Sequence, residues 1–256
     1  GTVQAAAYAA FLSVIEAYDF DILIYDGSDS ATLTAMQSFV KRMANDNGQY
    51  CQLVAAGMKN PDSRFAIDNE TGVTLTDTKL TKQQVCWWLG GAQAGAQYNQ
   101  SLTYAAYPDA VAVEPVLTNS QIISAINAGQ LVLIAENGQV KIETDINSLT
   151  TFTPEIGKVY RKNRVMRLCN TIANDIYQQF AANYIGIVNN NDAGRSQFRA
   201  AIVGYMVNLQ GEQAIQNFSS DDVEVLPGND IDSIVVNLAI QAVDSVEKIY
   251  MTVTVS

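Results

Sequence analysis

Three aspartates are the residues of this sequence whose types and spacing could support catalysis. Asp26 and Asp29 belong to the turn Asp26-Gly27-Ser28-Asp29-Ser30, which follows a short run of strand-forming residues. Asp21 lies before this turn. Doubly wound folds place phosphate or Mg²⁺ at such strand-to-helix turns, and carboxylates can hold Mg²⁺ without histidine. One hypothesis is therefore a Mg²⁺-dependent phosphohydrolase-like enzyme that uses these three carboxylates.

A simpler interpretation of the same turn is structural. Gly27 makes the turn, and Ser30 or Asp29 caps the following helix. The sequence contains no GxxxxGK[ST] or GxGxxG motif, so no nucleotide cofactor is indicated. It also contains no histidine, which excludes a Ser-His-Asp or Cys-His arrangement and a His-ligated metal site. The residues favour capping, and we expect neither enzyme activity nor a cofactor.

Composition and charge limit the remaining classes. The 256 residues are 48% hydrophobic and 16% charged, which is typical of a globular protein with one or two domains. A net charge of −11 disfavours nucleic-acid binding unless basic groups gather locally. Cys51, Cys86 and Cys169 are scattered among apolar residues, which favours buried free thiols. We expect no membrane insertion, and the start at Gly1 in place of Met indicates a fragment.

The first half of the chain has an α/β pattern. Helical periodicity in residues 3–18 and 33–44 brackets a strand at 20–25, and a second strand follows at 51–56. This βαβ unit implies a parallel pair with a right-handed crossover, and a third strand is expected at 64–67. Val3, Ala7, Phe11, Val14, Ile15 and Tyr18 form the predicted apolar stripe of the first helix.

Local signals continue to the end of this half. Thr81 and Gln84 form a capping box, so Gly90 and Gly91 lie inside a helix, where small residues favour close packing over phosphate binding. Ser120 is the predicted cap of a helix over 121–128. Asn137-Gly138 predicts a type I′ hairpin spanning 131–144. Ser, Thr and Pro concentrate near 149–154, which predicts an α/β domain over 1–150 and a second domain over 151–256.

The second half reads as α+β, with helices packed on a small antiparallel sheet. Helical stripes cover 165–180 and 198–209, and strand-forming runs cover 223–226, 233–243 and 246–255. The last run stops one residue before the chain ends, so it can pair within its own sheet or extend onto another subunit's sheet. The predicted inter-subunit strand is Ile249, Tyr250, Met251, Thr252, Val253, Thr254 and Val255.

Five of the fifteen basic residues fall within ten positions: Lys158, Arg161, Lys162, Arg164 and Arg167. Positive charge at the start of a helix opposes the helix dipole, which favours an acidic partner. Candidates within the same chain are Asp221, Asp222, Glu224, Asp230 and Asp232. If copies of the chain stack, the basic face of one subunit would meet the acidic face of another. Two alternatives remain open: a solvated helix with intramolecular pairs, and a nucleic-acid-binding module whose binding weakens with salt.

Many short strings of the sequence resemble those of one known family. In the second half these are Asn163-Arg164-Val165-Met166-Arg167, Asn174-Asp175-Ile176, Tyr184-Ile185-Gly186, Asn189-Asn190 with Gly194-Arg195, Ala214-Ile215-Gln216-Asn217-Phe218, Val223-Glu224-Val225 with Pro227-Gly228-Asn229-Asp230, and the ending from Glu247 to Val255. In the first half, Trp87, Leu89-Gly90-Gly91-Ala92 and the string Asn99-Gln100-Ser101-Leu102-Thr103-Tyr104 resemble the family's middle domain. The family that these strings resemble is the contractile tail sheath proteins of phages and prophages, and the resemblance covers nearly the whole chain.

The resemblance implies a structural role and no enzyme activity. It implies a middle domain with a subtilisin-like fold that lacks a catalytic triad, and a C-terminal domain that ends in an arm. Sheath subunits form stacked hexameric rings around a tail tube, between a baseplate and a tail terminator, and contraction drives the tube through a bacterial envelope. The chain would then be part of a virion tail or tail-like particle, assembled in the host cytoplasm. Its terminal strand would add to a neighbour's sheet.

Overall fold

The computed structural model describes residues 5–247 and residue 251. These residues divide into two compact units. The first unit extends to Met166 and includes the last described residues from Val246, and the second is Arg167–Ser245. The chain passes from the first unit to the second within helix α5 (Asn163–Asn183).

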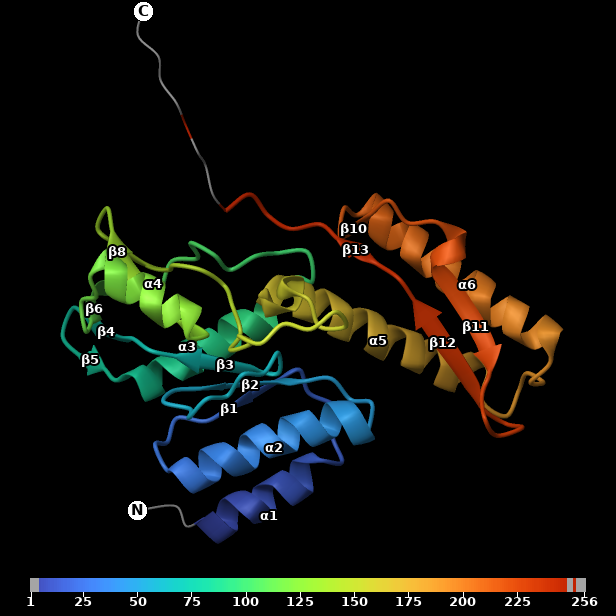
Figure 1. The fold of residues 1–256 in the computed structure, drawn as a ribbon. Helices are drawn as coiled ribbons and strands as arrows, with labels where there is room; N and C mark the ends of the chain where they lie inside the picture. The colour runs from blue at the N-terminus through green and yellow to red at the C-terminus, as the bar shows by residue number, and fades with distance from the viewer. Residues whose placement is uncertain (1–4, 248–250, 252–256) are drawn as a thin grey trace, which may run out of the picture. The chain divides into compact units, whose positions relative to one another are not determined.

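A four-stranded parallel sheet lies at the centre of the first unit (Figure 1). Its order is β1 (Ile22–Ile24), β2 (Gln52–Ala55), β3 (Ala66–Asn69) and β7 (Gln130–Leu131). Helix α2 (Ser30–Asp46) connects β1 to β2, which confirms the predicted βαβ unit. The third parallel strand is also confirmed, two residues later than expected.

Apolar residues fill both faces of this sheet, because successive side chains of a strand point to opposite sides. Leu53 and Ala55 pack with α1 (Ala5–Ile15) and the Met36, Phe39, Val40 and Met43 stripe of α2. Val54 points the other way, toward Val85 and Leu89 of α3 (Lys82–Gly95). The predicted stripe of the first helix is correct at Ile15, which faces the core with Tyr8 and Leu12, and wrong at Phe11 and Val14, which are 45% and 61% exposed. Val3 of that stripe lies outside the described residues.

Helix α3 confirms the predicted capping box, and it confirms close packing at Gly90 but not at Gly91, which is exposed with open space beside it. Thr81 and Gln84 form the capping box, with each side chain bonded to the other's backbone. A Cβ atom at Gly90 would lie 2.4 Å from Cδ1 of Ile24, so a larger residue would require the Ile24 side chain or the helix to shift. Cys86 of this helix and Cys51 are buried, and burial raises the pKa of each thiol to about 12.

The other strands of the first unit are antiparallel. One sheet contains β5 (Lys79–Leu80), β4 (Gly72–Leu75) and β6 (Ala110–Glu114), and β8 (Leu133–Glu136) pairs with β9 (Gln139–Ile142). Asn137 and Gly138 between β8 and β9 have φ of 51° and 75°, as a type I′ turn requires. Helix α4 (Asn119–Asn127) is capped by Thr118 and not by Ser120, because Gln121 completes a capping box with Thr118.

The second unit combines two helices with short antiparallel strands. Helix α6 (Asp192–Gly211) turns Phe198, Ile202, Met206 and Leu209 inward, and Tyr205 donates a 2.6 Å hydrogen bond to Asp175 of α5. The strands are β10 (Ile215–Gln216), β11 (Val223–Pro227), β12 (Ile234–Leu238) and β13 (Gln241–Ala242). The predicted run 233–243 is therefore two strands, since β12 pairs with β11 and β13 pairs with β10.

Asp68 is a buried carboxyl in the parallel sheet, 2% exposed at the end of β3. It accepts backbone hydrogen bonds from Gly57 (2.8 Å) and Met58 (3.2 Å), yet burial raises its pKa from 3.8 to about 6. A folded pKa above the unfolded one favours folding at low pH, and this contribution is lost as pH rises from about 4 to about 6.

We therefore expect the substitution Asp68→Asn to remove a pH-dependent loss of stability. Between pH 4 and pH 7 the unfolding free energy of the variant should improve relative to the unsubstituted protein by up to about 3 kcal/mol. Urea unfolding at the two pH values measures this difference, with the exposed Asp77→Asn as the control. A difference that stays constant with pH would show that Asp68 titrates normally.

Candidate assembly surfaces

The β11–β12 hairpin has two outer edges, and its hydrogen-bond pattern defines which groups point outward. Val225 faces Val236 in the register, and the Ala239 N–H donates to Asp222 O while the Gly228 N–H donates to Ser233 O, both at 2.9 Å. Hydrogen-bonded pairs alternate with non-bonded pairs in an antiparallel ladder. Val225 and Val236 are thus a non-bonded pair, and their backbone N–H and C=O groups point away from the hairpin.

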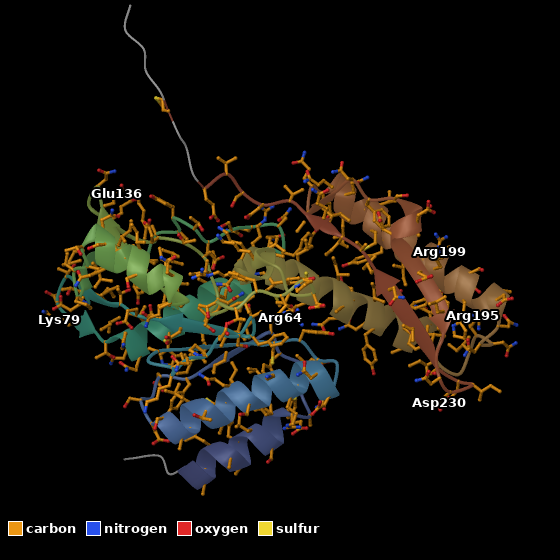
Figure 2. The ribbon with its side chains drawn as sticks, viewed as in Figure 1. Arg64, Lys79, Glu136, Arg195, Arg199 and Asp230 are labelled. Atoms are coloured by element: carbon orange, nitrogen blue, oxygen red, sulfur yellow. The ribbon has the colours of Figure 1, made fainter. Side chains whose placement is uncertain are left out.

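The outer edge of β11 is largely occupied. Its Val223 N–H donates to Ser220 O, and Arg199 of α6 donates from Nε to Val223 O at 2.8 Å (Figure 2 labels Arg199). Pro227, the last outward-facing residue, has no N–H. Val225 is left as the one position of this edge with an unused donor among the described residues.

The outer edge of β12 is open. Its outward-facing residues are Ile234, Val236 and Leu238, at every second position. Within the described part of the chain, their N–H and C=O groups have no hydrogen-bond partner. An unpaired edge of this kind can accept a further strand. The hairpin therefore offers one open edge and one largely closed edge.

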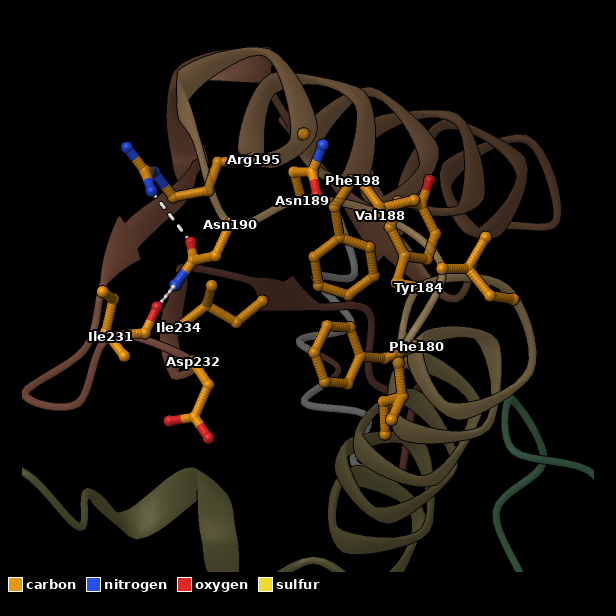
Figure 3. A pocket seen from close by; sticks show the side chains of 14 residues that line it. Phe180, Tyr184, Val188, Asn189, Asn190, Arg195, Phe198, Ile231, Asp232 and Ile234 are labelled. Atoms are coloured by element: carbon orange, nitrogen blue, oxygen red, sulfur yellow. Dashed lines mark hydrogen bonds between the residues drawn. The ribbon is translucent and has the colours of Figure 1, made fainter.

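A side-chain latch holds the loop of this hairpin. Asn190 donates from Nδ2 to the carbonyls of Ile231 and Ser233, both at 2.9 Å, and accepts from Arg195 at 2.8 Å. Figure 3 shows Asn190 between Arg195 and Ile231, beside a hollow of about 630 Å³ lined by Phe180, Phe198 and other residues. The loop between α5 and α6 thereby positions the start of β12.

The substitution Asn190→Ala should loosen this loop. Two hydrogen bonds to carbonyls at an exposed site contribute about 1 kcal/mol together, so the effect on global stability is modest. Backbone amides of residues 229–233 should exchange with solvent several-fold faster, as hydrogen-exchange mass spectrometry can measure. Asn189→Ala is the matched control, and equal exchange in both variants would contradict the latch.

The basic cluster does not form the open surface that we predicted. Of the five residues, Lys158 is exposed, Arg161, Lys162 and Arg167 are half-buried, and Arg164 is 8% exposed. Arg161 donates to the carbonyl of Ile126, and Lys162 forms an ion pair with Glu247. The reason is that the start of α5 lies against the core of the first unit, where Met166 is 2% exposed. This placement leaves Lys158 as the exposed member of the cluster, and it leaves little of the cluster exposed for the alternative of a nucleic-acid-binding module.

The acidic candidates lie on the hairpin and beside it. Asp221, Glu224, Asp230 and Asp232 are exposed. Asp222 accepts from the Ser219 N–H at 2.7 Å and caps the short helix η2 (Ser220–Asp222), and Glu224 accepts from Asn237 at 3.0 Å. The open hairpin therefore carries a negative surface.

The three aspartates of the enzyme hypothesis do not form one site. Asp29 accepts from the backbone N–H and the hydroxyl of Thr32, at 2.8 and 2.7 Å, which caps α2 and lowers the pKa of Asp29. Asp26 accepts from Nε1 of Trp87 at 3.0 Å. Among residues 5–247 and 251, no group of three His, Cys, Asp or Glu could hold a metal ion, so the hypothesis that Asp21 joins these two in a Mg²⁺ cluster is wrong. The capping interpretation is confirmed for Asp29.

The predicted terminal strand falls mostly outside the described residues, which include Met251 but not Ile249, Tyr250, Thr252, Val253, Thr254 or Val255. Met251 is 74% exposed and is not in a strand. Glu247, just before this segment, belongs to the ending string that resembles the family but was not predicted as a site residue, although its carboxylate is held by Lys162, Ser101 and Thr103. In the described chain no helix combines the length and apolar character needed to cross a membrane.

These features define a class: a mixed α/β protein of small sheets whose open strand edge and acidic hairpin suit association with other chains. The chain belongs to the phage tail sheath protein family. Residues 1–148 match the family model for the phage tail sheath protein central domain, and residues 155–256 match the phage tail sheath C-terminal domain. It is thus a structural sheath protein by family.

Individual proteins agree with this assignment. The phage-like element PBSX protein XkdK of Bacillus subtilis is 32% identical over 97% of this chain and 56% of its own length. The crystal structure of a sheath tail protein from Desulfitobacterium hafniense has 38% identity and a TM-score of 0.88, over 98% of this chain and 60% of that one. The helical sheath of the anti-feeding prophage in its contracted state has the same fold, with a TM-score of 0.72 at 15% identity over 98% of this chain and 73% of that one. The chain therefore spans little more than half the length of XkdK.

Proposed function

We propose that this chain is part of a contractile sheath subunit that polymerises as stacked hexameric rings around a tail tube. Contraction of the stack drives the tube through a bacterial envelope. The partners are copies of the same protein, the tube protein inside, and a baseplate and tail terminator at the ends. The particle is a phage tail or tail-like particle that assembles in the host cytoplasm. Membership of the sheath family and the likeness to a contracted helical sheath support this function.

The first unit serves as a rigid body in this proposal. A parallel sheet with α2 on one face and α3 on the other supports a subtilisin-like arrangement. The sequence given has no histidine with which to build a protease triad. The apolar clusters packed on both sides of the sheet would resist deformation and so transmit force.

The observation that carries the assembly mechanism is the open edge of β12. Residues 249–255 of a second copy would pair with the outward groups of Ile234, Val236 and Leu238 and extend the hairpin into a larger sheet. Main-chain ladders hold two copies together without fixing their side-chain contacts. The copies can therefore rotate relative to each other during contraction while the link persists.

Charge supplies a second, weaker contact. The exposed acids Asp221, Glu224, Asp230 and Asp232 would meet basic groups of a neighbouring copy, for which Lys158 is the exposed member of the predicted cluster. Such pairs favour correct docking and are screened by salt. They would steer assembly, while the strand ladder would hold it.

Electron microscopy of the full-length protein tests this function. Hollow ringed tubes that shorten and widen on contraction are the expected result. Dispersed monomers at every concentration and salt condition would contradict it. Mg²⁺-dependent phosphatase turnover would instead revive the enzyme hypothesis, and we expect none.

A further inference from the structure

The described part of the chain returns to the first unit at residues 246–247, where the carboxylate of Glu247 is buried. After β13 it has no regular structure, and Val246 is 94% exposed. The next residue is different: the Glu247 side chain is 10% exposed. Farther on, Met251 is again 74% exposed. Glu247 thus bonds the C-terminal end of the described chain to the first unit.

Side chains of Ser101, Thr103 and Lys162 hold this carboxylate. Ser101 and Thr103 donate from their hydroxyls to Oε1 at 3.1 and 2.8 Å, and Lys162 donates from Nζ to Oε2 in an ion pair. Burial raises the pKa of Glu247, but the bonds from Lys162, Thr103 and Ser101 outweigh burial and lower it below the usual value. The group is therefore ionised at neutral pH. Charge-assisted bonds to a buried carboxylate are stronger than bonds between neutral groups.

The residues that hold Glu247 are themselves held by hydrogen bonds. The Asp145 N–H donates to the Thr103 hydroxyl at 2.9 Å, and the Leu102 N–H donates to Asp145 Oδ2 at 3.1 Å. Asp145, 1% exposed, also accepts from Gln93 of α3 at 2.6 Å and from Asn163 of α5 at 2.8 Å. Residues 101–103 are thus braced against two helices, so Glu247 is fixed to the core and not to a loose loop.

We propose that Glu247 is an anchor that fixes the point on the first unit from which the chain continues into the terminal segment, residues 248–256. A fixed start limits the positions that the segment can sample, and this raises its effective concentration near an acceptor edge on a neighbouring copy. The anchor also transmits tension in the segment to the first unit, through Lys162 and residues 101–103. The inference rests on the proposed function, since it assigns a role within strand exchange between copies.

The test compares the substitution Glu247→Ala with the matched control Glu155→Ala in the full-length protein. Glu155 is an exposed glutamate of the same unit. We expect Glu247→Ala to raise the protein concentration at which half of the chains pellet as tubes by about tenfold, and Glu155→Ala to leave it unchanged. Circular dichroism should show folded monomers for both. Glu247→Gln keeps an acceptor for the two hydroxyls and should fall between them.

The lysine partner provides a second variant with an independent readout. Lys162→Met should raise the same concentration, and the double variant Glu247→Ala/Lys162→Met should be no worse than the worse single variant, because both remove one interaction. A purely additive effect, or normal assembly of Glu247→Ala, would overturn the anchor. Deletion of residues 249–256 separates the two hypotheses: lost tubes in the deletion with normal tubes in Glu247→Ala refute only the anchor, whereas normal tubes in the deletion refute the strand exchange beneath it.

Discussion

Deletion of residues 249–256 should abolish tube formation while the monomer stays folded. In the proposed assembly this segment supplies every backbone hydrogen bond from one copy to the β12 edge of the next, so no partial ladder would remain. The folding core should survive, because the fully buried apolar residues of the described chain occur at or before Val223. Sedimentation and electron microscopy would measure assembly, and thermal unfolding would measure the monomer.

The control for this deletion is removal of Ser256 alone. Ser256 lies beyond the predicted strand, so its loss should leave the tubes unchanged. Tubes formed normally by the longer deletion would contradict the arm hypothesis. A deleted protein that unfolds at a much lower temperature would show that the segment stabilises its own chain.

The substitution Val236→Pro should prevent assembly by blocking the open edge of β12. The Val236 N–H points outward, so proline removes this donor without breaking a hydrogen bond inside the hairpin. Lost pairing and steric conflict with an incoming strand together cost about 3 kcal/mol, which raises the concentration for half-maximal tube formation by about a hundredfold or more. Pelleting assays over a concentration series would measure the shift.

Val225→Pro is the matched control, because Val225 faces Val236 in the register and also points its N–H outward. Both substitutions should lower monomer stability by a similar amount, since both shorten a half-buried valine. On the largely closed edge of β11, however, Val225→Pro should assemble almost normally. If the two variants are equally impaired, or if Val225→Pro alone is impaired, the incoming strand does not use β12.

Local sequence signals predicted the elements well where a few neighbouring residues determine the structure. The capping box of Thr81 and Gln84, the Asn137-Gly138 turn and the apolar stripe of α2 all lie within one or two turns of chain. The steric and hydrogen-bond rules for these features need no distant partner. The same reasoning predicted the parallel β1–β2 pair, because a strand-helix-strand order leaves few topologies.

Predictions that depended on distant packing were less reliable. The prediction for the buried stripe of α1 failed in part because this helix carries apolar residues on all its sides. Only contact with α2 and β1 selects Tyr8, Leu12 and Ile15 as the buried ones. The run 233–243 was divided because two different partner strands claim its halves. Neither partner can be identified from the run itself.

The sequence by itself determined the family, the main elements and the absence of histidine chemistry, since these follow from residue types and short-range order. Only the tertiary structure decided which charged residues are available. It buried Arg164, paired Lys162 with Glu247 eighty-five positions away, and left β12 open while Arg199 closed β11. Burial and pairing arise from contacts between distant segments, and the spacing of charges along the chain contains no record of those contacts.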